Sequence, residues 1–323
     1  MTDRFGDLDH RIVRTKITAE TGLGVIDFLA GRFTYHTREE WEKLVTDGIV
    51  TVNGERRKNN APLIADDVIE YHVSELPEPA AELRFSVVYE NDRLIAVDKP
   101  GNLACHPAGP FYRHTLWFLL KKQRGDIFMV NRIDRETSGL VLIAKTAAAA
   151  AYYAKRLPDI RKTYLALVHG IVPAAIDADG WLEPDAASEV RKKRRFVTTP
   201  QSPAAQTAHT VIRPLRNVEN FTFVEAELHT GRTHQIRATL CSLGHPLVGD
   251  KLYGVDDTIY LRTRNDNLTP EDRKKLILPR QALHAAKVVI PEPDGGLLEI
   301  EAPPPDFYSF SGKSGIFDAN SDM

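Results

Sequence analysis

The chain has 323 residues, of which 42% are hydrophobic and 27% are charged, a composition typical of folded proteins and sufficient for two domains with a substantial core. Its two cysteines, Cys105 and Cys241, exclude a disulfide framework, and neither has the spacing of a paired metal ligand. The formal net charge of −2 gives no overall attraction to a polyanion, so a nucleic-acid site would require a local cluster of basic residues.

We expect a cytoplasmic protein without a membrane partner. The N-terminal sequence MTDRFGDLDH lacks the apolar core of a signal peptide. No apolar run elsewhere approaches the roughly 20 residues that span a bilayer.

The N-terminal part, residues 1–74, predicts a small module that contains a helix and a hairpin. Thr37 and Glu40 have the spacing of a capping box, in which each side chain binds a backbone N–H of the first helical turn, so HTREEWEKLVTD predicts a helix that the following glycine ends. In IVTVNGERR the apolar residues alternate before Asn53 and Gly54, a pair that accepts the positive φ angles of a tight turn. DDVIEYHV then offers a closing strand.

A strand-rich segment, residues 83–308, follows a predicted linker at residues 75–82, whose sequence ELPEPAAE has two prolines. Short β-branched or aromatic runs predict its strands: FSVVYE, RLIAVDK, GLVLIAK, TYLALVHG, TAHTVIRPL, FTFVEAEL and KVVIPE. Helices are fewer. TAAAAAYYAKRL is ended by Pro158, and TPEDRKKLIL has Thr269 as N-cap with Pro270 at its first helical position. Strands and helices alternate too rarely for a barrel or a doubly wound sheet, so we expect a mixed α/β fold.

NRIDRETSGL, residues 131–140, places one aspartate between two arginines. If NRID is extended, Arg132 and Asp134 point to one face and Arg135 to the other. A nearby guanidinium favours the charged carboxylate and would hold Asp134 ionised, as a nucleophile or a base must be. Taken alone, the pattern is more typical of a structural ion pair at the end of a strand.

A second cluster of polar and cationic side chains occurs in LHTGRTHQIRATLCSLGHPLVGDKLYG, residues 228–254. Arg232, His234 and Arg237 stand where a loop is predicted to enter a helix. Guanidinium groups hold carboxylates or phosphates through paired hydrogen bonds, and a helix start adds backbone donors. A solvated helix start with a packed histidine is the alternative interpretation.

Taken together, several segments resemble the motifs of RNA pseudouridine synthases of the RluA type, in the same order and at similar spacing. They are DKPGNLACHP, NRIDRETSGLVLIAKT, RKTYLALVHG and the segment 228–254, with RQALHAAKVVIPEP and EAPPPDFY resembling the family's C-terminal part. The resemblance covers roughly residues 83–308. It implies an α/β (α+β) fold with a mixed, largely antiparallel central sheet crossed by the active cleft. It also implies an isomerase that detaches uracil from the ribose at N1 and rejoins it through C5, so that nothing is consumed and no cofactor is required.

The resemblance assigns roles to four residues. Asp134 corresponds to the catalytic aspartate, and Arg237 to the basic residue that pairs with it. Tyr164 matches the tyrosine that stacks on the target base, and Arg132 matches the arginine that helps to displace the target nucleotide from its helix. Leaving the stack costs roughly a few kcal/mol, part of which an aromatic platform offsets.

One position departs from the family pattern. Asn131 stands immediately before Arg132, where the family usually has histidine. Asparagine keeps the ability to form hydrogen bonds but carries no proton or charge. We expect a change in local support or in RNA contact, with activity retained.

The N-terminal module resembles a small RNA-binding module that occurs in a small-subunit ribosomal protein and in many synthases of this class. Arg56 and Arg57 are its candidate phosphate contacts. Residues 1–82, however, contain 10 Lys and Arg against 16 Asp and Glu, a net of −6. A packing or protein contact is therefore the alternative role of this module.

RKKRR, residues 191–195, is the densest basic run, and either contacts phosphate or forms a solvated face. Together with residues of the motifs, it gives the candidate RNA contacts of the larger segment: Arg132, Arg232, His234, Lys192, Lys193 and Arg194.

From the sequence we therefore predict an RNA pseudouridine synthase with a module at residues 1–74, a linker at 75–82, a catalytic domain at 83–308 and a tail at 309–323. Structured RNA is the predicted partner, with ribosomal RNA of the large subunit favoured and transfer RNA open. We expect a monomer with no metal and no cofactor. The rivals are a non-catalytic RNA-binding or ribosome-assembly factor on the same fold, and a sugar-processing lyase. The lyase is disfavoured because glycosidases typically pair two carboxylates.

Overall fold

The computed structural model describes residues 12–19, 21–33, 35–57, 60–72, 78–264 and 267–312. The chain divides into two compact units, of which one comprises residues 1–81 and 104–125 and the other residues 82–103 and 126–323. The smaller unit thus takes in a segment that lies within the predicted catalytic domain, and the predicted domain limits stay a prediction. No helix among the described residues is long and apolar enough to cross a membrane.

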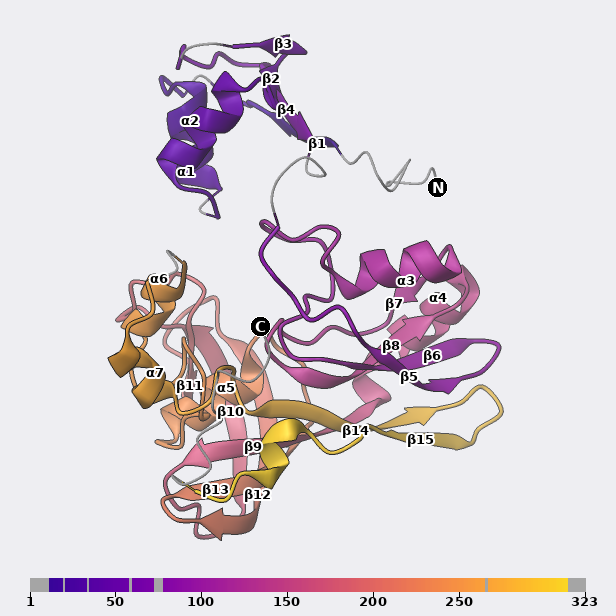
Figure 1. Ribbon diagram of the computed structural model, residues 1–323. Helices are drawn as coiled ribbons and strands as arrows, with labels where there is room; N and C mark the ends of the chain where they lie inside the picture. Colours follow the sequence, from indigo (N-terminus) through magenta and orange to yellow (C-terminus); the bar gives the residue numbers. More distant parts are fainter. Residues whose placement is uncertain are drawn as a thin grey trace. The chain divides into compact units, whose positions relative to one another are not determined.

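The smaller unit combines a four-stranded antiparallel sheet with helices (Figure 1). The strands, in the spatial order β1-β4-β2-β3, are β1 (Ile12–Lys16), β2 (Val50–Val52), β3 (Glu55–Arg56) and β4 (Val68–His72). The helices are α1 (Val25–Arg32), α2 (Arg38–Thr46) and α3 (Leu116–Arg124). Trp41 of α2 is fully buried, and its ring meets that of Tyr71 from β4 at 5.6 Å between centroids, which joins helix and sheet in one core.

The local signals in this unit are confirmed. The hydroxyl of Thr37 accepts the backbone N–H of Glu40 at 3.2 Å, and the Glu40 carboxylate accepts the N–H of Thr37 at 2.7 Å, so the capping box is complete. Asn53 and Gly54 have φ angles of 55° and 78° in the turn between β2 and β3. Of the predicted linker, residues 75–77 lie outside the described residues, and residues 78–82 form neither helix nor strand.

The larger unit is built on one 11-stranded sheet, mixed and mostly antiparallel as predicted. Its path is β11-β10-β12-β13-β9-β14-β8-β6-β5, with β15 paired to β14 and β7 paired to β8. Only the β14–β8 pairing is parallel among the described strands. The strands are β5 (Ser86–Glu90), β6 (Leu94–Lys99), β7 (Phe128–Met129), β8 (Ser138–Ala144), β9 (Arg161–His169), β10 (Ile176–Pro184), β11 (Arg194–Val197), β12 (Gln206–Val218), β13 (Phe221–Leu228), β14 (Leu283–Pro291) and β15 (Leu297–Glu301).

The helices of the larger unit are α4 (Ala147–Lys155), α5 (Gln235–Ser242), α6 (Thr258–Arg264) and α7 (Pro270–Leu276), with 3-10 turns η2 (Leu157–Asp159) and η3 (Asp306–Ser309). Helix α4 contacts β7 and β8, whereas α5 contacts β10, β11 and β12. All seven residues of β8 are buried, which explains why SGLVLIA is apolar on both faces. As predicted, α4 ends before Pro158, and Thr269 caps α7 with Pro270 in its first turn.

The parallel contact between β8 and β14 depends on Gly139. Its φ is +103°, and a Cβ there would lie 2.3 Å from the carbonyl oxygen of Ala285, so a larger residue would push the strands apart. Just before these strands, the Gln281 amide donates to the hydroxyl of Thr137 at 2.6 Å. The loop that precedes β8 is therefore tied to the segment that precedes β14, and this loop carries Asp134.

Candidate active site

Asp134 lies between β7 and β8, in a loop whose backbone is held from β6. Lys99, the fully buried last residue of β6, donates from Nζ to the carbonyl oxygen of Arg135 at 3.1 Å. The N–H of Leu103 donates to the same carbonyl at 3.2 Å. These contacts fix the backbone next to Asp134, because a buried ammonium group must find acceptors within the fold.

Asn131 supports the same loop through β8. Its Oδ1 accepts the N–H of Leu142 at 2.7 Å, while the Leu142 carbonyl accepts the N–H of Val130 at 2.8 Å. The side chain thus continues the β7–β8 pairing by one residue. Of the two expectations for this departure from the family pattern, the geometry supports the change in local support, a role that requires no charge.

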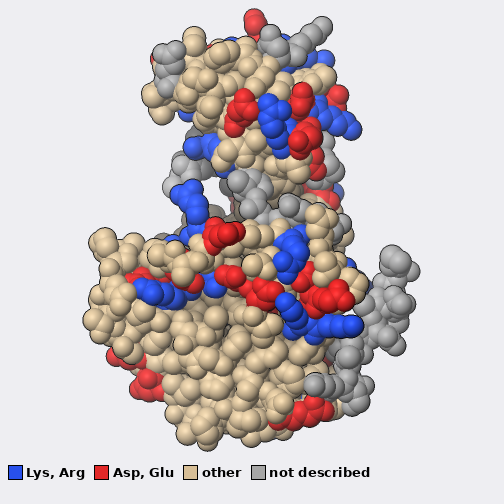
Figure 2. Space-filling view, turned by 90° about the vertical axis from the view of Figure 1, so that its left-hand side faces the viewer, with Lys and Arg blue, Asp and Glu red and all other residues tan. Residues whose placement is uncertain are grey.

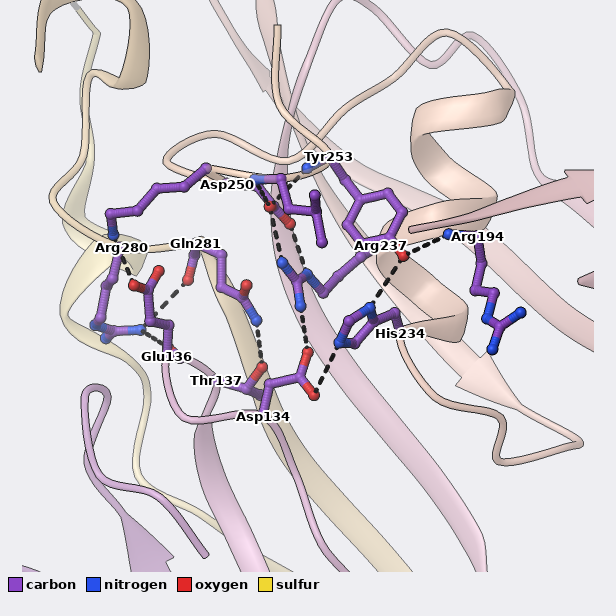
Figure 3. Close-up of polar contacts among 12 residues, drawn as sticks. Asp134, Glu136, Thr137, Arg194, His234, Arg237, Asp250, Tyr253, Arg280 and Gln281 are labelled. Carbon is purple, nitrogen blue, oxygen red and sulfur yellow. Dashed lines mark hydrogen bonds and ion pairs between the residues drawn. The ribbon is translucent and has the colours of Figure 1, made fainter. Parts of the chain in front are cut away.

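The cation that binds Asp134 is Arg237, from the first turn of α5. Its Nη1 donates to Oδ2 of Asp134 at 2.6 Å, while Nε and Nη2 donate to the two oxygens of Asp250 at 2.7 and 2.9 Å (Figure 3). Asp250 also accepts the backbone N–H groups of Leu252 and Tyr253, each at 2.9 Å. One guanidinium therefore bridges two carboxylates, and Asp250 fixes its plane.

The local interpretation of NRIDRE needs correction on this point. Residues 131–134 belong to no strand, Arg132 is exposed, and Arg135 donates to Glu136 at 3.2 Å. The ion pair with Asp134 comes instead from Arg237, 103 residues later. The family resemblance implied this pairing, whereas the spacing of neighbouring charges did not.

Asp250 was missed as a site residue in the sequence. It stands in the quoted segment VGDKLYG, where a lone aspartate among glycines and apolar residues is a weak signal. Its importance follows from burial, because its side chain is 0% exposed and a buried carboxylate must be paired.

Burial and charge act in opposite directions on the two carboxylates. Burial raises the pKa of Asp134, but its neighbours, with the charge of Arg237 first among them, outweigh burial and hold the pKa below its ordinary value. The pKa of Asp250 is lowered in the same way, with the N–H groups of Tyr253 and Leu252 adding to the effect of Arg237. Both carboxylates are therefore charged at neutral pH. Only Asp134 is reachable, since its side chain is 31% exposed.

His234 and Tyr253 lie next to the ion pair of Asp134 and Arg237. Nε2 of His234 lies 4.0 Å from Oδ1 of Asp134, and its Nδ1 lies 3.0 Å from the hydroxyl of Tyr253. Burial and the positive charge of Arg237 lower the pKa of His234 to about 4, so the ring is neutral at pH 7. The tyrosine hydroxyl also accepts the backbone N–H of Arg194 at 3.0 Å.

A cavity of about 180 Å³ opens in front of Asp134. Residues from six separate segments line it, among them Asp134, Lys192, His234, Arg237, Lys251 and Tyr260. Nζ of Lys251 binds Glu136 at 2.7 Å, and Nζ of Lys192 stands 4.2 Å from the ring centre of Tyr260. The cavity thus presents the carboxylates of Asp134 and Glu136 among cations, an arrangement suited to a polyanionic substrate that reacts at a carboxylate.

Tyr164 lies on β9, opposite Ala226 of β13 and Ala285 of β14. Its side chain belongs to the buried core that also contains Ile236 of α5, and only 7% of the residue is exposed. Tyr164 is therefore largely covered by the core of the larger unit. The base-stacking role implied for Tyr164 stays a prediction.

The basic run 191–195 does not form a uniformly solvated face. Lys193 donates to Asp257 at 2.8 Å with only 14% of its side chain exposed, and Arg195 binds the buried Glu183 at 2.7 Å. Lys192 remains exposed at the cavity. Figure 2 shows the same mixing of charges over a wider surface, where basic side chains lie beside acidic ones.

The remaining candidate RNA contacts lie apart in sequence. Arg232 precedes α5 and donates from Nε to the carbonyl of Thr207 at 3.1 Å. Arg56 is exposed on β3 of the smaller unit, and Arg57 lies 3.7 Å from the carboxylate of the buried Asp67. Their contact with RNA stays a prediction. In the described part of the chain, no group of three or more His, Cys, Asp or Glu side chains is arranged to hold a metal ion.

Comparisons with known proteins agree on one family. A family model described as RNA pseudouridylate synthase matches residues 93–242. The ribosomal large subunit pseudouridine synthase D of Nitrosomonas europaea is 34% identical over 237 residues, which cover 70% of this chain and 64% of that protein. The protein of the same name from Zymomonas mobilis is 31% identical over 289 residues, which cover 83% of this chain and 86% of that protein.

A solved structure gives independent support for the fold. Human RNA Pseudouridylate Synthase Domain Containing 1 matches with a TM-score of 0.56 and 24% identity, covering 71% of this chain and 87% of that chain. The likeness shows a shared fold, and the predicted fold class is confirmed.

Proposed function

Because this chain belongs to the RNA pseudouridine synthase family, as its motifs predicted, we propose that it converts uridine to pseudouridine in ribosomal RNA of the large subunit, with Asp134 as the reacting carboxylate. The observation that carries the proposal is the geometry of Asp134. It is charged, held on one oxygen by a buried arginine, and open to a cavity on the other side.

The reaction demands a charged carboxylate and little else. The bond between N1 of uracil and the ribose breaks, a bond from C5 forms, the C5 proton leaves and N1 gains a proton, so atoms and electrons balance without a cofactor. Asp134 has three candidate tasks: attack on the sugar, attack on the base, or removal of a ribose proton. Each task requires the ionised carboxylate. Arg237 supplies that form by lowering the pKa of Asp134.

Support for the ribosomal target comes from the relatives. Proteins named ribosomal large subunit pseudouridine synthase D match this chain at about 30% identity. Transfer RNA is the alternative substrate. A non-catalytic ribosome-assembly factor on the same fold is the alternative function.

The experiment that tests the proposal maps pseudouridine across all cellular RNA. Cells with the wild-type gene, without it, and with Asp134→Asn are compared. We expect one or a few sites in large-subunit ribosomal RNA to vanish in both altered strains. If pseudouridine is lost only from transfer RNA, transfer RNA becomes the proposed substrate. If no pseudouridine site changes in either strain, a non-catalytic assembly factor becomes the better account.

The two neighbouring lysines of the basic run are expected to respond differently to neutralisation. Lys192 is exposed at the cavity, so Lys192→Gln should flatten the dependence of log affinity for RNA on log salt by about 0.7–0.9, the value of one phosphate contact. Lys193 is already paired with Asp257, so Lys193→Gln should lower thermal stability and leave the slope unchanged. Salt titrations of RNA binding, with melting curves for both variants, check this. Equal slopes for Lys192→Gln and the wild type would show that Lys192 contacts no phosphate.

A further inference from the structure

His234 occupies a constrained position between the reacting carboxylate and the basic strand β11. It is the N-cap of α5 with φ 60° and ψ 19°, and its side chain is 11% exposed. Its ring packs edge-on against Tyr253, with centroids 5.5 Å apart. The ring orientation is therefore set by packing, and each of its nitrogens faces a defined group.

The directions of the hydrogen bonds determine where the imidazole proton sits. The backbone N–H of Arg194 can only donate, so the Tyr253 hydroxyl accepts that bond at 3.0 Å (Figure 3). Of the described groups, Nδ1 of His234 is the acceptor within reach of the hydroxyl proton, at 3.0 Å. Nδ1 thus accepts, and a neutral ring with an accepting Nδ1 carries its proton on Nε2.

The charged groups around the ring keep it neutral. Arg237 from α5 and Lys192 from the basic run oppose a positive charge on His234, and Asp134 and Asp250 favour one. Burial adds to the effect of the cations, and together they outweigh the carboxylates, so the pKa falls to about 4. Between pH 5 and pH 8 His234 is therefore expected to be a fixed N–H donor.

We propose that His234 is a positioning residue for Asp134: its Nε2–H is directed at Oδ1, the oxygen that Arg237 leaves open, and Tyr253 with the backbone of Arg194 holds the ring in the required tautomer. The Nε2–Oδ1 distance of 4.0 Å exceeds a hydrogen bond by on the order of 1 Å. Hydrogen bonds of this kind are often long in free enzymes and shorten when substrate binds. Arg237 and His234 then hold one carboxylate oxygen each, which fixes the orientation of the reacting lone pairs.

This proposal deepens the function proposed above and rests on Asp134 as the reacting carboxylate. It also gives the basic run a task besides RNA contact, because the strand β11 sets the tautomer through a backbone N–H. The RNA contact expected for His234 from the sequence is the competing role, and the two roles move different measured quantities.

Two substitutions at His234 separate the roles in single-turnover reactions on the RNA fragment that mapping identifies. Asparagine tolerates positive φ, so His234→Asn should fold, but its amide does not reach the Nε2 position. We expect its rate to fall roughly tenfold to a hundredfold with RNA affinity unchanged. His234→Gln places an N–H near Nε2 and should recover most of the rate. His229→Asn, at a side chain that is 44% exposed, is the matched control and should react like the wild type.

A measurement on the free protein tests the tautomer without any reaction. In protein with ¹⁵N-labelled histidine, we expect the His234 signals, identified by their loss in His234→Asn, to be those of the Nε2–H form from pH 5 to pH 8. Tyr253→Phe should give a mixture of tautomers and a slower reaction. A proton on Nδ1, a titration near pH 6.5, or His234 variants that change only RNA affinity would each overturn the proposal. If Asp134→Asn stays active, the catalytic assignment fails instead, whatever the tautomer.

Discussion

Asp134→Asn is expected to reduce pseudouridine formation by at least about 10⁴-fold while RNA affinity stays within about twofold of the wild type. The amide has nearly the shape of the carboxylate but neither its negative charge nor its nucleophilicity. The fold should persist, because Arg237 keeps its two hydrogen bonds to the fully buried Asp250.

The measurement is single-turnover formation of pseudouridine by purified protein, with RNA affinity and a melting curve recorded on the same samples. Asp177→Asn makes the same chemical change at a carboxylate whose side chain is 72% exposed, and it should leave the rate unchanged. A rate for Asp134→Asn within tenfold of the wild type would remove Asp134 from the reaction.

Arg237→Met is expected to lower the free energy of unfolding by about 3–5 kcal/mol, because it leaves the carboxylates of Asp134 and Asp250 without the cation between them. Burial and mutual repulsion then raise the pKa of Asp134 instead of lowering it. Turnover should fall at neutral pH, and the remaining activity should rise with pH as the carboxylate ionises.

The loss of stability in Arg237→Met is expected to depend on pH. In the wild type the pKa values of both carboxylates are lowered, so their stabilisation is full above about pH 4 and is lost as the pH falls through the folded-state pKa values. In Arg237→Met the raised pKa values penalise the folded state most at high pH. The loss of stability should therefore be larger at pH 8 than at pH 5, as urea unfolding at both values can measure.

A double variant provides the control for this interpretation. Arg237→Met with Asp250→Asn removes one of the two unpaired charges and should recover part of the lost stability, more of it at pH 8 than at pH 5. If the double variant is less stable than Arg237→Met at pH 8, the loss comes from packing, and the charge argument is wrong.

Short-range features of this protein could be predicted from its sequence because their causes lie within a few residues. The capping box of Thr37 and Glu40, the turn at Asn53 and Gly54, and the N-cap at Thr269 each depend on contacts between near neighbours. The family was predictable for a related reason. Motifs such as NRIDRETSGL and HTGRTHQIR contain both polar side chains of the candidate site and the apolar residues that hold them in the fold. The order and spacing of such motifs can therefore be read directly from the sequence.

The partners of the charged side chains were decided only by the tertiary structure. Arg135 is next to Asp134 in sequence yet donates to Glu136, while the cation on Asp134 comes from Arg237. Lys193 likewise donates to Asp257, 64 residues later in the sequence. Which charges meet depends on the order of strands in the 11-stranded sheet and on the loops that join them, and a Coulomb interaction depends on distance in space and on burial, not on separation along the chain. The sequence indicated which carboxylate to propose as the reacting group, and the fold decided which cation keeps that carboxylate charged.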